Sequence, residues 1–293
     1  MANRRVLVKR RKAARNIRKI TRTMQLISTA RFQAAFSAAV AGRPYTDKLA
    51  ELVGNLARAA KGLKHPLLQR PPEERRSALV VLTSSRGLCG GYNTNVLRLA
   101  VEHCDTKADS GADVELDVVG KKGIAYLKYL RREVAEEITT ISDRPRFEEV
   151  EPLANTMMQR FVAGELDSVW IVYMKFISAG KQRPVVERLL PLSPEETLGI
   201  KGEPRGSQVQ YEFSPAPEEL LEELLPATVR VRLYQAFMDA AVSEHLARMV
   251  AMKAATDAAE EMIRRLTLQY NRARQTQITM ELLDIVGGAN ALT

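Results

Sequence analysis

The sequence is poor in cysteine, histidine and aromatic residues, and each shortage excludes a class of protein. Two cysteines and three histidines occur in 293 residues, too few for a disulfide framework or a typical structural zinc site. No window approaches about 18 consecutive apolar residues, so no transmembrane helix is predicted. Aromatic residues make up 5% of the chain, a share more typical of long helices rich in Ala, Leu and Arg than of an aromatic-lined pocket.

The start of the chain lacks the apolar core of a secretory signal. Its first residues are basic and free of acid, as in a transit peptide, but they are poor in Ser and continue without a break into a helical pattern. We therefore expect a folded helix here rather than a cleaved leader. The two cysteines, Cys89 and Cys104, suggest a reducing compartment.

Acidic residues are absent from residues 1–31, where eleven basic residues occur. The rest of the chain has 33 basic and 35 acidic residues, so the net charge of +9 originates in this segment. Such a concentration predicts an acidic partner, which is nucleic acid, an anionic membrane surface or acidic loops of another protein. A solvated helix face is the alternative, disfavoured by like-charge repulsion between successive turns. The basic residues are Arg4, Arg5, Lys9, Arg10, Arg11, Lys12, Arg15, Arg18, Lys19, Arg22 and Arg31.

Glycine and proline are missing from two long stretches, residues 2–41 and 227–286. Both stretches have the apolar period of a helix, and Pro226 and Gly287–Gly288 are expected to bound the second one. A helix of 60 residues spans about 90 Å, far more than the width of a compact domain of this mass. Such lengths are typical of coiled coils.

Apolar residues at spacings of three and four predict the contact line of each long helix, here called the seam. In the first helix we expect a bend at Gly42 and Pro44 and a resumed helix to about Ala60. The predicted N-terminal seam is Ile17, Ile20, Met24 and Ile27, continued by Ala30, Ala34, Ala38 and Ala41. The predicted C-terminal seam is Val229, Leu233, Ala236, Ala240, Ser243, Ala247, Val250 and Ala254.

The middle of the chain alternates predicted strands with predicted helices, which implies βαβ units. The predicted strands are Ala78–Thr83, Val114–Val119, Val169–Ile177 and Val209–Phe213. The predicted helices are Asn95–Cys104, Gly123–Ala135 and Pro152–Ala163, and Leu192–Ser207 is expected to be a loop.

The predicted fold class is α/β. A Rossmann-like, mostly parallel sheet domain, residues 75–213, is inserted between two long terminal helices, residues 1–60 and 218–287. Because neither helix can bury its seam alone, we expect the two to pair as an antiparallel coiled coil.

The segment Thr83–Asn93, which reads TSSRGLCGGYN, follows a predicted strand and precedes a helix. Phosphate binds at such turns in α/β folds. However, its glycines match neither GxGxxG nor a P-loop, so glycines for a tight turn are the favoured interpretation. Cys89 has no neighbouring base, and Ser84 and Ser85 lack a nucleophile elbow.

The acidic residues Glu218, Glu219, Glu222 and Glu223 have helical spacing and are interpreted as a solvated face rather than a metal site. The sequence thus offers no acid–base pair, catalytic triad or metal-ligand set. These observations favour a binding or mechanical protein over an enzyme.

Several stretches resemble the gamma subunit of F-type ATP synthase, and the resemblance covers nearly the whole chain from about residue 7. The most specific are residues 16–35 (NIRKITRTMQLISTARFQAA), residues 83–95 (TSSRGLCGGYNTN) and a C-terminal run that begins EHLARMVAMKAATDAAEE and ends LLDIVGGANAL. The shorter segments GKKGIAYL and PVVERLLPL also fit.

The resemblance implies a non-catalytic rotor, the central stalk, that couples rotation of the c ring to ATP synthesis or hydrolysis. In that family the paired terminal helices turn inside a ring of alpha and beta subunits, while the α/β domain stands on the c ring beside the epsilon subunit. The alpha and beta subunits bind the nucleotide and Mg²⁺, so no cofactor is expected on this chain. The resemblance further implies a peripheral protein on the cytoplasmic face of a bacterial membrane, and leaves the coupling ion, proton or sodium, open.

The resemblance also assigns roles to particular residues. Contacts to the beta subunit are expected at Met24, Arg274, Gln275 and Thr279. A basic face at Arg10, Arg11, Arg15, Arg18, Lys19 and Arg22 is expected to meet an acidic loop of the beta subunit. Contact with the c ring is expected at Tyr211 and Phe213. The central family motif comprises Gly87, Leu88, Cys89, Gly90 and Gly91.

Two other classes of protein remain as alternatives. A nucleic-acid-binding protein with a basic helical arm predicts DNA binding with steep salt dependence, although the basic segment lacks the interleaved aromatics of single-strand binders. A Rossmann-type enzyme predicts nucleotide binding by the isolated chain at the Gly-rich turn.

Overall fold

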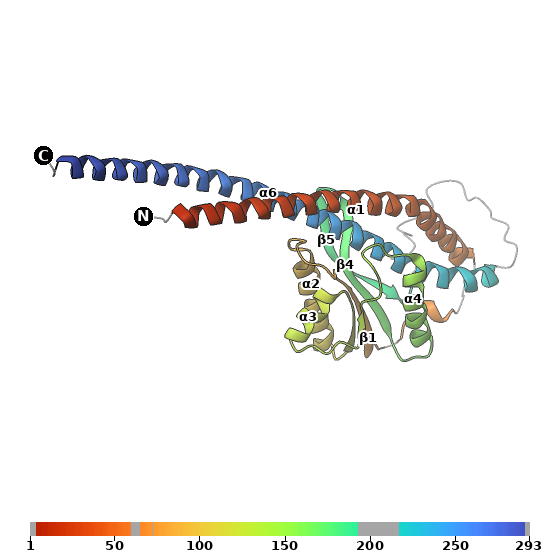
Figure 1. The fold of residues 1–293 in the computed structure, drawn as a ribbon. Helices are drawn as coiled ribbons and strands as arrows, with labels where there is room; N and C mark the ends of the chain where they lie inside the picture. Colours follow the sequence, from red (N-terminus) through yellow and green to blue (C-terminus); the bar gives the residue numbers. More distant parts are fainter. Residues whose placement is uncertain (1–3, 60–64, 72, 193–216, 291–293) are drawn as a thin grey trace. The chain divides into compact units, whose positions relative to one another are not determined.

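The computed structural model describes residues 4–59, 65–71, 73–192 and 217–290 (Figure 1). The described chain separates into two compact units. Unit 1 comprises Met1–Thr29 and Arg248–Thr293, and unit 2 comprises Ala30–Ala247. No helix among the described residues is long and apolar enough to cross a membrane.

Two very long helices contribute to both units, and both were predicted. Helix α1 is Arg4–Ala59 and continues through Pro44, so the predicted bend did not end it. Helix α6 is Pro217–Asn290, close to the predicted range 218–287, but it continues through Pro226 and Gly287–Gly288, which were expected to bound its Gly- and Pro-free stretch. Leu221, Leu225 and Val229 flank that proline and are fully buried. Their packing offsets the hydrogen bond that a proline removes from a helix interior.

A five-stranded sheet of order β3-β2-β1-β4-β5 forms the centre of unit 2. The first four strands are parallel neighbours, and β5 pairs antiparallel with β4. The strands are β1 (Arg76–Leu82), β2 (Asp113–Val119), β3 (Glu136–Ile138), β4 (Ser168–Ser178) and β5 (Lys181–Leu190). The predicted fold class, a mostly parallel α/β sheet between two long terminal helices, is therefore confirmed.

Two of the five strands were not predicted from the sequence. β3 has only three residues, and β5 has the charged sequence KQRPVVERLL with a proline inside it. An edge strand tolerates both features because one side of its backbone bonds to no other strand. The predicted strand Val209–Phe213 lies outside the described residues.

Helices cover both faces of the sheet (Figure 1). On one face, α2 (Tyr92–Asp109) and α3 (Lys121–Tyr129) pack on a core that includes Leu79, Val81 and Val172. On the other face, α4 (Phe147–Val162) packs together with the unit 2 parts of α1 and α6. A short 3-10 helix, η1, spans Pro66–Leu68.

The contacts divide the chain differently from the predicted segments 1–60, 75–213 and 218–287. Leu49, Val53 and Leu56 of α1 belong to the same buried core as Leu221–Ala240 of α6 and the sheet. The long helices are therefore part of the sheet unit over about half of their length, and only residues 1–29 and 248–293 form a separate unit. These helix segments pack on the sheet because their large apolar side chains are removed from water there.

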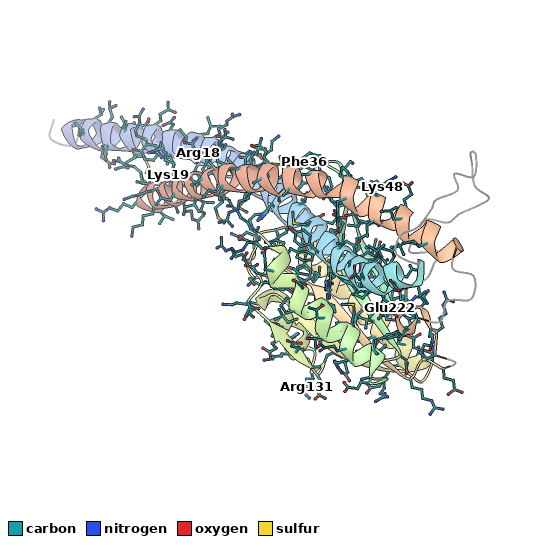
Figure 2. All side chains as sticks on the ribbon, turned by 90° about the vertical axis from the view of Figure 1, so that its right-hand side faces the viewer. Arg18, Lys19, Phe36, Lys48, Arg131 and Glu222 are labelled. Carbon is teal, nitrogen blue, oxygen red and sulfur yellow. The ribbon has the colours of Figure 1, made fainter. Side chains whose placement is uncertain are left out.

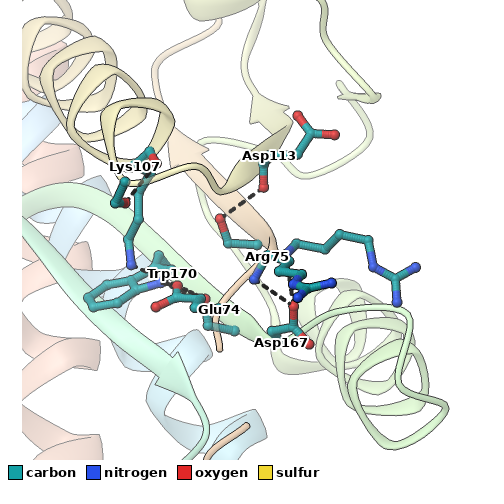
Figure 3. A network of polar contacts seen from close by, with 10 residues as sticks. Glu74, Arg75, Lys107, Asp113, Asp167 and Trp170 are labelled. Atoms are coloured by element: carbon teal, nitrogen blue, oxygen red, sulfur yellow. Dashed lines mark hydrogen bonds and ion pairs between the residues drawn. The ribbon is translucent and has the colours of Figure 1, made fainter. Parts of the chain in front are cut away.

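Polar groups stabilise the edge of the sheet at which β1 and β4 begin (Figure 3). The Glu74 carboxylate accepts hydrogen bonds from Lys107 Nζ (2.7 Å), Trp170 Nε1 (3.0 Å) and Ser168. Burial alone would raise the pKa of Glu74, but these three donors outweigh it and lower that pKa. Asp167 accepts hydrogen bonds from the main-chain N–H groups that begin β1, so this edge is tied together by two carboxylates.

Asp117 is a buried carboxyl group in the middle of β2. It is 1% exposed, and its Oδ2 atom has no hydrogen-bond partner. Burial raises the pKa of Asp117 to about 7, and the nearby Glu136 carboxylate adds to the rise, while Arg160 opposes it. The folded protein therefore binds a proton here more tightly than the unfolded chain does.

We expect the Asp117→Asn variant to be more stable than the natural protein at pH 8, by a few kcal/mol. The ordinary pKa of 3.8 applies to the unfolded chain, and the folded value is about 7. The free energy of unfolding is thus highest at low pH and falls as the pH rises between these values. Asparagine removes this loss, so urea unfolding at pH 8 and pH 5 should show a larger gain at pH 8. Asp113→Asn, at the exposed start of the same strand, is the matched control and should show no such difference.

Candidate functional site

The two ends of the chain pair as antiparallel helices in unit 1. Thr21 Oγ1 of α1 lies 2.9 Å from Thr256 Oγ1 of α6, and Leu7 and Ala14 pack with Leu266. The guanidinium of Arg11 lies over the Tyr270 ring at 4.8 Å. As the residue number rises along α1 it falls along α6, which defines the antiparallel direction. The coiled-coil pairing expected from the sequence is thus present in this unit.

The seam of α1 lies on a different face from the one predicted. Ile17, Ile20 and Ile27, expected at the contact line, are 52%, 60% and 49% exposed. The buried residues instead recur at intervals of seven: Leu7, Ala14, Thr21 and Ser28. Small side chains let two helices approach closely, whereas a row of isoleucines would hold them apart. The larger apolar stripe is therefore left on the outside of the pair.

The predicted seam of α6 is correct over its first part only. Val229, Leu233 and Ala240 are buried, but within unit 2. In unit 1 the expected positions Val250 and Ala254 are exposed. The buried residues there are Met252, Thr256, Ala259 and Leu266. The contact line thus shifts by two residues between the part of α6 that faces the sheet and the part that faces α1.

The predicted basic face is displayed on the surface of unit 1. The side chains of Arg10, Arg15, Arg18, Lys19 and Arg22 are exposed, and Arg11 is half-buried against Tyr270. Figure 2 labels Arg18 and Lys19 on this part of α1. Arg18 lies 3.6 Å from Glu260, but with side chains 48% and 45% exposed the pair contributes little to stability. These cations are consequently available to an acidic partner.

The last turns of α6 extend beyond the start of α1. Arg4, the first described residue of α1, lies near Tyr270, so the later turns of α6 extend past the described part of α1. Arg274, Gln275 and Thr279 are all exposed, and Thr279 Oγ1 donates to the Gln275 carbonyl at 3.0 Å. The described residues of this stretch form a single helix whose side chains face outward.

Large apolar side chains are exposed on that single helix. Leu282, Leu283 and Ile285 are 58%, 60% and 72% exposed. A groove of about 710 Å³ also lies where the start of α1 meets this part of α6, lined by the apolar residues Leu7, Ala273 and Met280 and by polar and charged residues such as Arg4, Gln277 and Glu281. Large apolar side chains that stay exposed in this number are typical of a protein-binding surface.

The structure does not bring the predicted beta-contact residues together in one place. Met24 is half-buried and lies one turn after Thr21, which is level with Thr256. Arg274 is 18 residues further along α6, which corresponds to about 27 Å along the helix axis. Contacts at Met24 and at Arg274 would therefore be two separate sites. Tyr211 and Phe213, predicted to face the c ring, lie outside the described residues.

The Gly-rich motif Gly87–Gly91 forms the turn between β1 and α2, as predicted. Leu88 and Gly90 have φ values of 65° and 57°, and the Leu88 side chain is exposed while Cys89 is buried. Gly90 adopts this left-handed conformation without strain. An exposed leucine in the same conformation is unusual.

The polar groups of this turn bond to one another. The Ser84 N–H donates to Asn93 Oδ1 at 3.0 Å, and the Asn93 amide donates to Ser84 Oγ at 2.8 Å and to Cys89 Sγ at 3.3 Å. The main-chain N–H groups of Tyr92 and Asn95 bond to carbonyls within the turn. These bonds, which link Ser84, Cys89 and Asn93, shape the turn and favour the structural interpretation of its glycines.

The part of the chain that the structure describes has no group of three or more His, Cys, Asp or Glu side chains placed to hold a metal ion. Its two thiols, Cys89 and Cys104, are buried and unpaired with each other. Burial raises the pKa of the Cys104 thiol to about 11, so this group is a poor nucleophile.

The fold and these surfaces define an interaction protein: an α/β sheet unit whose terminal helices pair and display basic and apolar surfaces. The family model described as ATP synthase matches residues 3–292. The ATP synthase gamma chain of Rhodopirellula baltica is 43% identical, with 100% of this chain and 99% of the relative covered. That of Leptospira biflexa is 41% identical, with both chains fully covered. The chain belongs to the ATP synthase gamma chain family.

Solved structures show the same fold at low sequence identity. The central stalk and c ring structure of the Tetrahymena thermophila mitochondrial ATP synthase contains a chain with a TM-score of 0.60 and 21% identity, covering 80% of this chain and 99% of that one. A Euglena gracilis mitochondrial ATP synthase structure contains a chain with a TM-score of 0.64 and 18% identity, covering 99% of this chain and 94% of that one.

The position of the seam can be tested with two substitutions on α1. Ala14→Leu places a large side chain at a 1% exposed position and should destabilise the helix pair by about 1–3 kcal/mol, because overpacking forces the helices apart. Ile17→Ala, at an exposed position, should change stability by less than about 0.5 kcal/mol. Hydrogen exchange of the α1 amides measures both effects locally. A larger loss of stability for Ile17→Ala than for Ala14→Leu would indicate the seam expected from the sequence instead.

Proposed function

We propose that this chain is the non-catalytic rotor subunit, the central stalk, of an F-type ATP synthase. In this role it couples ion-driven rotation of the c ring to ATP synthesis or hydrolysis at the alpha and beta subunits. The observation that carries the proposal is the antiparallel helix pair of unit 1, continued by the single helix of α6 with its exposed apolar side chains. Family membership supports it.

The differing faces of the helix pair suit the coupling role. One face of α1 carries Ile17, Ile20 and Ile27, while cations such as Lys19 and Arg22 are exposed on another face of the same helix. A rod of this kind makes different contacts with each of several identical partners. Rotation then changes the conformational equilibrium of each partner in turn, because a binding partner shifts an equilibrium only through differential contacts.

The proposed partners are the alpha and beta subunits around the terminal helices, and the epsilon subunit and c ring at the α/β sheet. The catalytic nucleotide and Mg²⁺ would be bound by the alpha and beta subunits, and this chain would bind no cofactor of its own. The glycines of the turn at Gly87–Gly91 match neither GxGxxG nor a P-loop, which supports that assignment.

Contacts with the beta subunit are proposed at Met24 and, in a separate place, at Arg274, Gln275 and Thr279. The exposure of the last three on a single helix supports this, because their polar groups are accessible from most directions. The basic face from Arg10 to Arg22 would meet an acidic loop of the beta subunit. Tyr211 and Phe213 remain the proposed contacts with the c ring.

The proposed location is the cytoplasmic face of a bacterial plasma membrane, reached through the c ring. The gamma chains of the bacteria Rhodopirellula baltica and Leptospira biflexa, similar over their full length, support a bacterial complex.

Recovery of the intact complex tests the rotor function directly. An affinity-tagged chain expressed in its host should co-purify with ATPase alpha and beta subunits from detergent-solubilised membranes, and its deletion should abolish ion-coupled ATP synthesis. The basic segment permits a contrary outcome, recovery with DNA and release with a steep dependence on salt. That outcome would contradict the proposal.

Replacing Arg274, Gln275 and Thr279 together with Ala should reduce ATP hydrolysis by the assembled complex about tenfold. Such a loss corresponds to about 1.4 kcal/mol of interaction with the beta subunit. The measurement is the hydrolysis rate per assembled complex.

The matched control replaces Arg98, Glu102 and Thr106, which are exposed on α2 and include one pair, Glu102 and Thr106, with the four-residue spacing of Gln275 and Thr279. Thr106 Oγ1 donates to the Glu102 carbonyl at 2.8 Å, as Thr279 does to Gln275. Equal activity of the two triple variants would show that the C-terminal residues have no special contact.

A further inference from the structure

Three separate parts of unit 2 contact Asp143, which lies between β3 and α4. Arg31 of α1 donates from Nη1 to Asp143 Oδ2. Arg86, in the turn after β1, places its Nη1 atom 3.7 Å from the same oxygen. His245 Nε2 of α6 lies 3.1 Å from the Asp143 main-chain oxygen. One residue thus joins both long helices to the Gly-rich turn of the sheet.

The segment that carries Asp143 is held in place by its own contacts. Ser142 Oγ donates to the Arg144 carbonyl at 2.9 Å and accepts from the Arg144 N–H at 3.2 Å, which closes a tight turn around Asp143. Ile141 packs in the apolar core that the sheet shares with α1 and α6. The carboxylate is therefore presented from a fixed position.

The charges make this junction stronger than an ordinary surface ion pair. Arg31 and Asp143 each have side chains only 25% exposed, so solvent screens their attraction less than that of exposed pairs. A single carboxylate also separates two guanidinium groups, those of Arg31 and Arg86. Loss of this carboxylate removes the negative charge between the two cations.

The position of the junction along the helices is also specific. Arg31 lies next to Ala30, the first residue of unit 2 on α1, and His245 lies two residues before Ala247, the last residue of unit 2 on α6. Asp143 therefore holds each long helix at the point where it passes from the sheet unit into the helix pair of unit 1.

We propose that Asp143 is a positioning residue that fixes the rotational setting of α1 and α6 against the sheet, so that torque passes from the sheet unit into both helices. This inference rests on the proposed rotor function. In this role, the junction of Asp143, Arg31 and Arg86 prevents the two helices from turning independently of the sheet. Leu49, Val53 and Leu56 of α1 join the apolar core of the sheet unit, but they lie 18 or more residues further along the helix than Arg31.

The test uses the complete complex in membrane vesicles with the Asp143→Asn variant, which keeps the shape of the side chain and removes its charge. ATP hydrolysis and ATP-driven ion uptake are measured on the same vesicles. We expect hydrolysis within about twofold of normal, and ion uptake per ATP hydrolysed to fall about fivefold, the lower range of typical coupling energies. A purely structural role would lower the amount of assembled complex without changing this ratio.

Three further variants sharpen the result. Asp143→Glu keeps the charge and should restore most of the ratio. Arg31→Gln should lower it, and adding it to Asp143→Asn should cause no further loss, because two members of one pair are not additive. Asp105→Asn is the control, since it breaks an ion pair with Arg132 in the sheet unit that involves neither long helix.

The two proposals fail in different ways. A natural chain that does not assemble with alpha and beta subunits contradicts the rotor function itself. Normal coupling in an assembled Asp143→Asn complex overturns only the role of Asp143. If that variant does not assemble, Arg31→Gln is measured in its place, and a normal ratio there overturns the inference equally.

Discussion

The packing of two helices along a line of mostly small residues is the contact on which unit 1 depends. Leu7, Ala14, Thr21 and Ser28 recur every seven residues on α1, and Thr21 meets Thr256 of α6 directly. A heptad repeat keeps one face of a helix turned toward its partner. The contact line of α1 buries little apolar surface. The larger side chains of α1 therefore stay outside the pair, where they are available to other subunits of an ATP synthase.

Unit 2 depends on a different kind of packing, and the contrast explains how one helix serves two purposes. Leu221, Leu225 and Leu233 of α6 are fully buried in the core of the sheet unit, and large apolar residues of this kind give that core its stability. Further along, the same helix buries Thr256 and Ala259 instead. The share of large apolar residues among the buried ones thus falls where the partner changes from a sheet to a single helix.

The sequence was sufficient to predict the long helices and the parallel sheet, because missing Gly and Pro and alternating strand and helix patterns are local signals. It misplaced the seam of α1, since Ile17 and Ile20 form the more apolar stripe and only the partner decides which stripe is buried. It missed β5, whose Pro184 and charged residues are tolerated only at a sheet edge. The junction at Asp143 joins Arg31 and His245, more than 100 residues away on either side, so no local pattern reveals it.

The single-helix stretch of α6 after Arg274 has a mechanical consequence. A lone α-helix bends and twists more easily than two helices packed side by side, so this stretch is the most compliant part of unit 1. Under load it behaves as a torsion spring in series with a stiffer bar. Steps made at one end of such an assembly reach the other end smoothed.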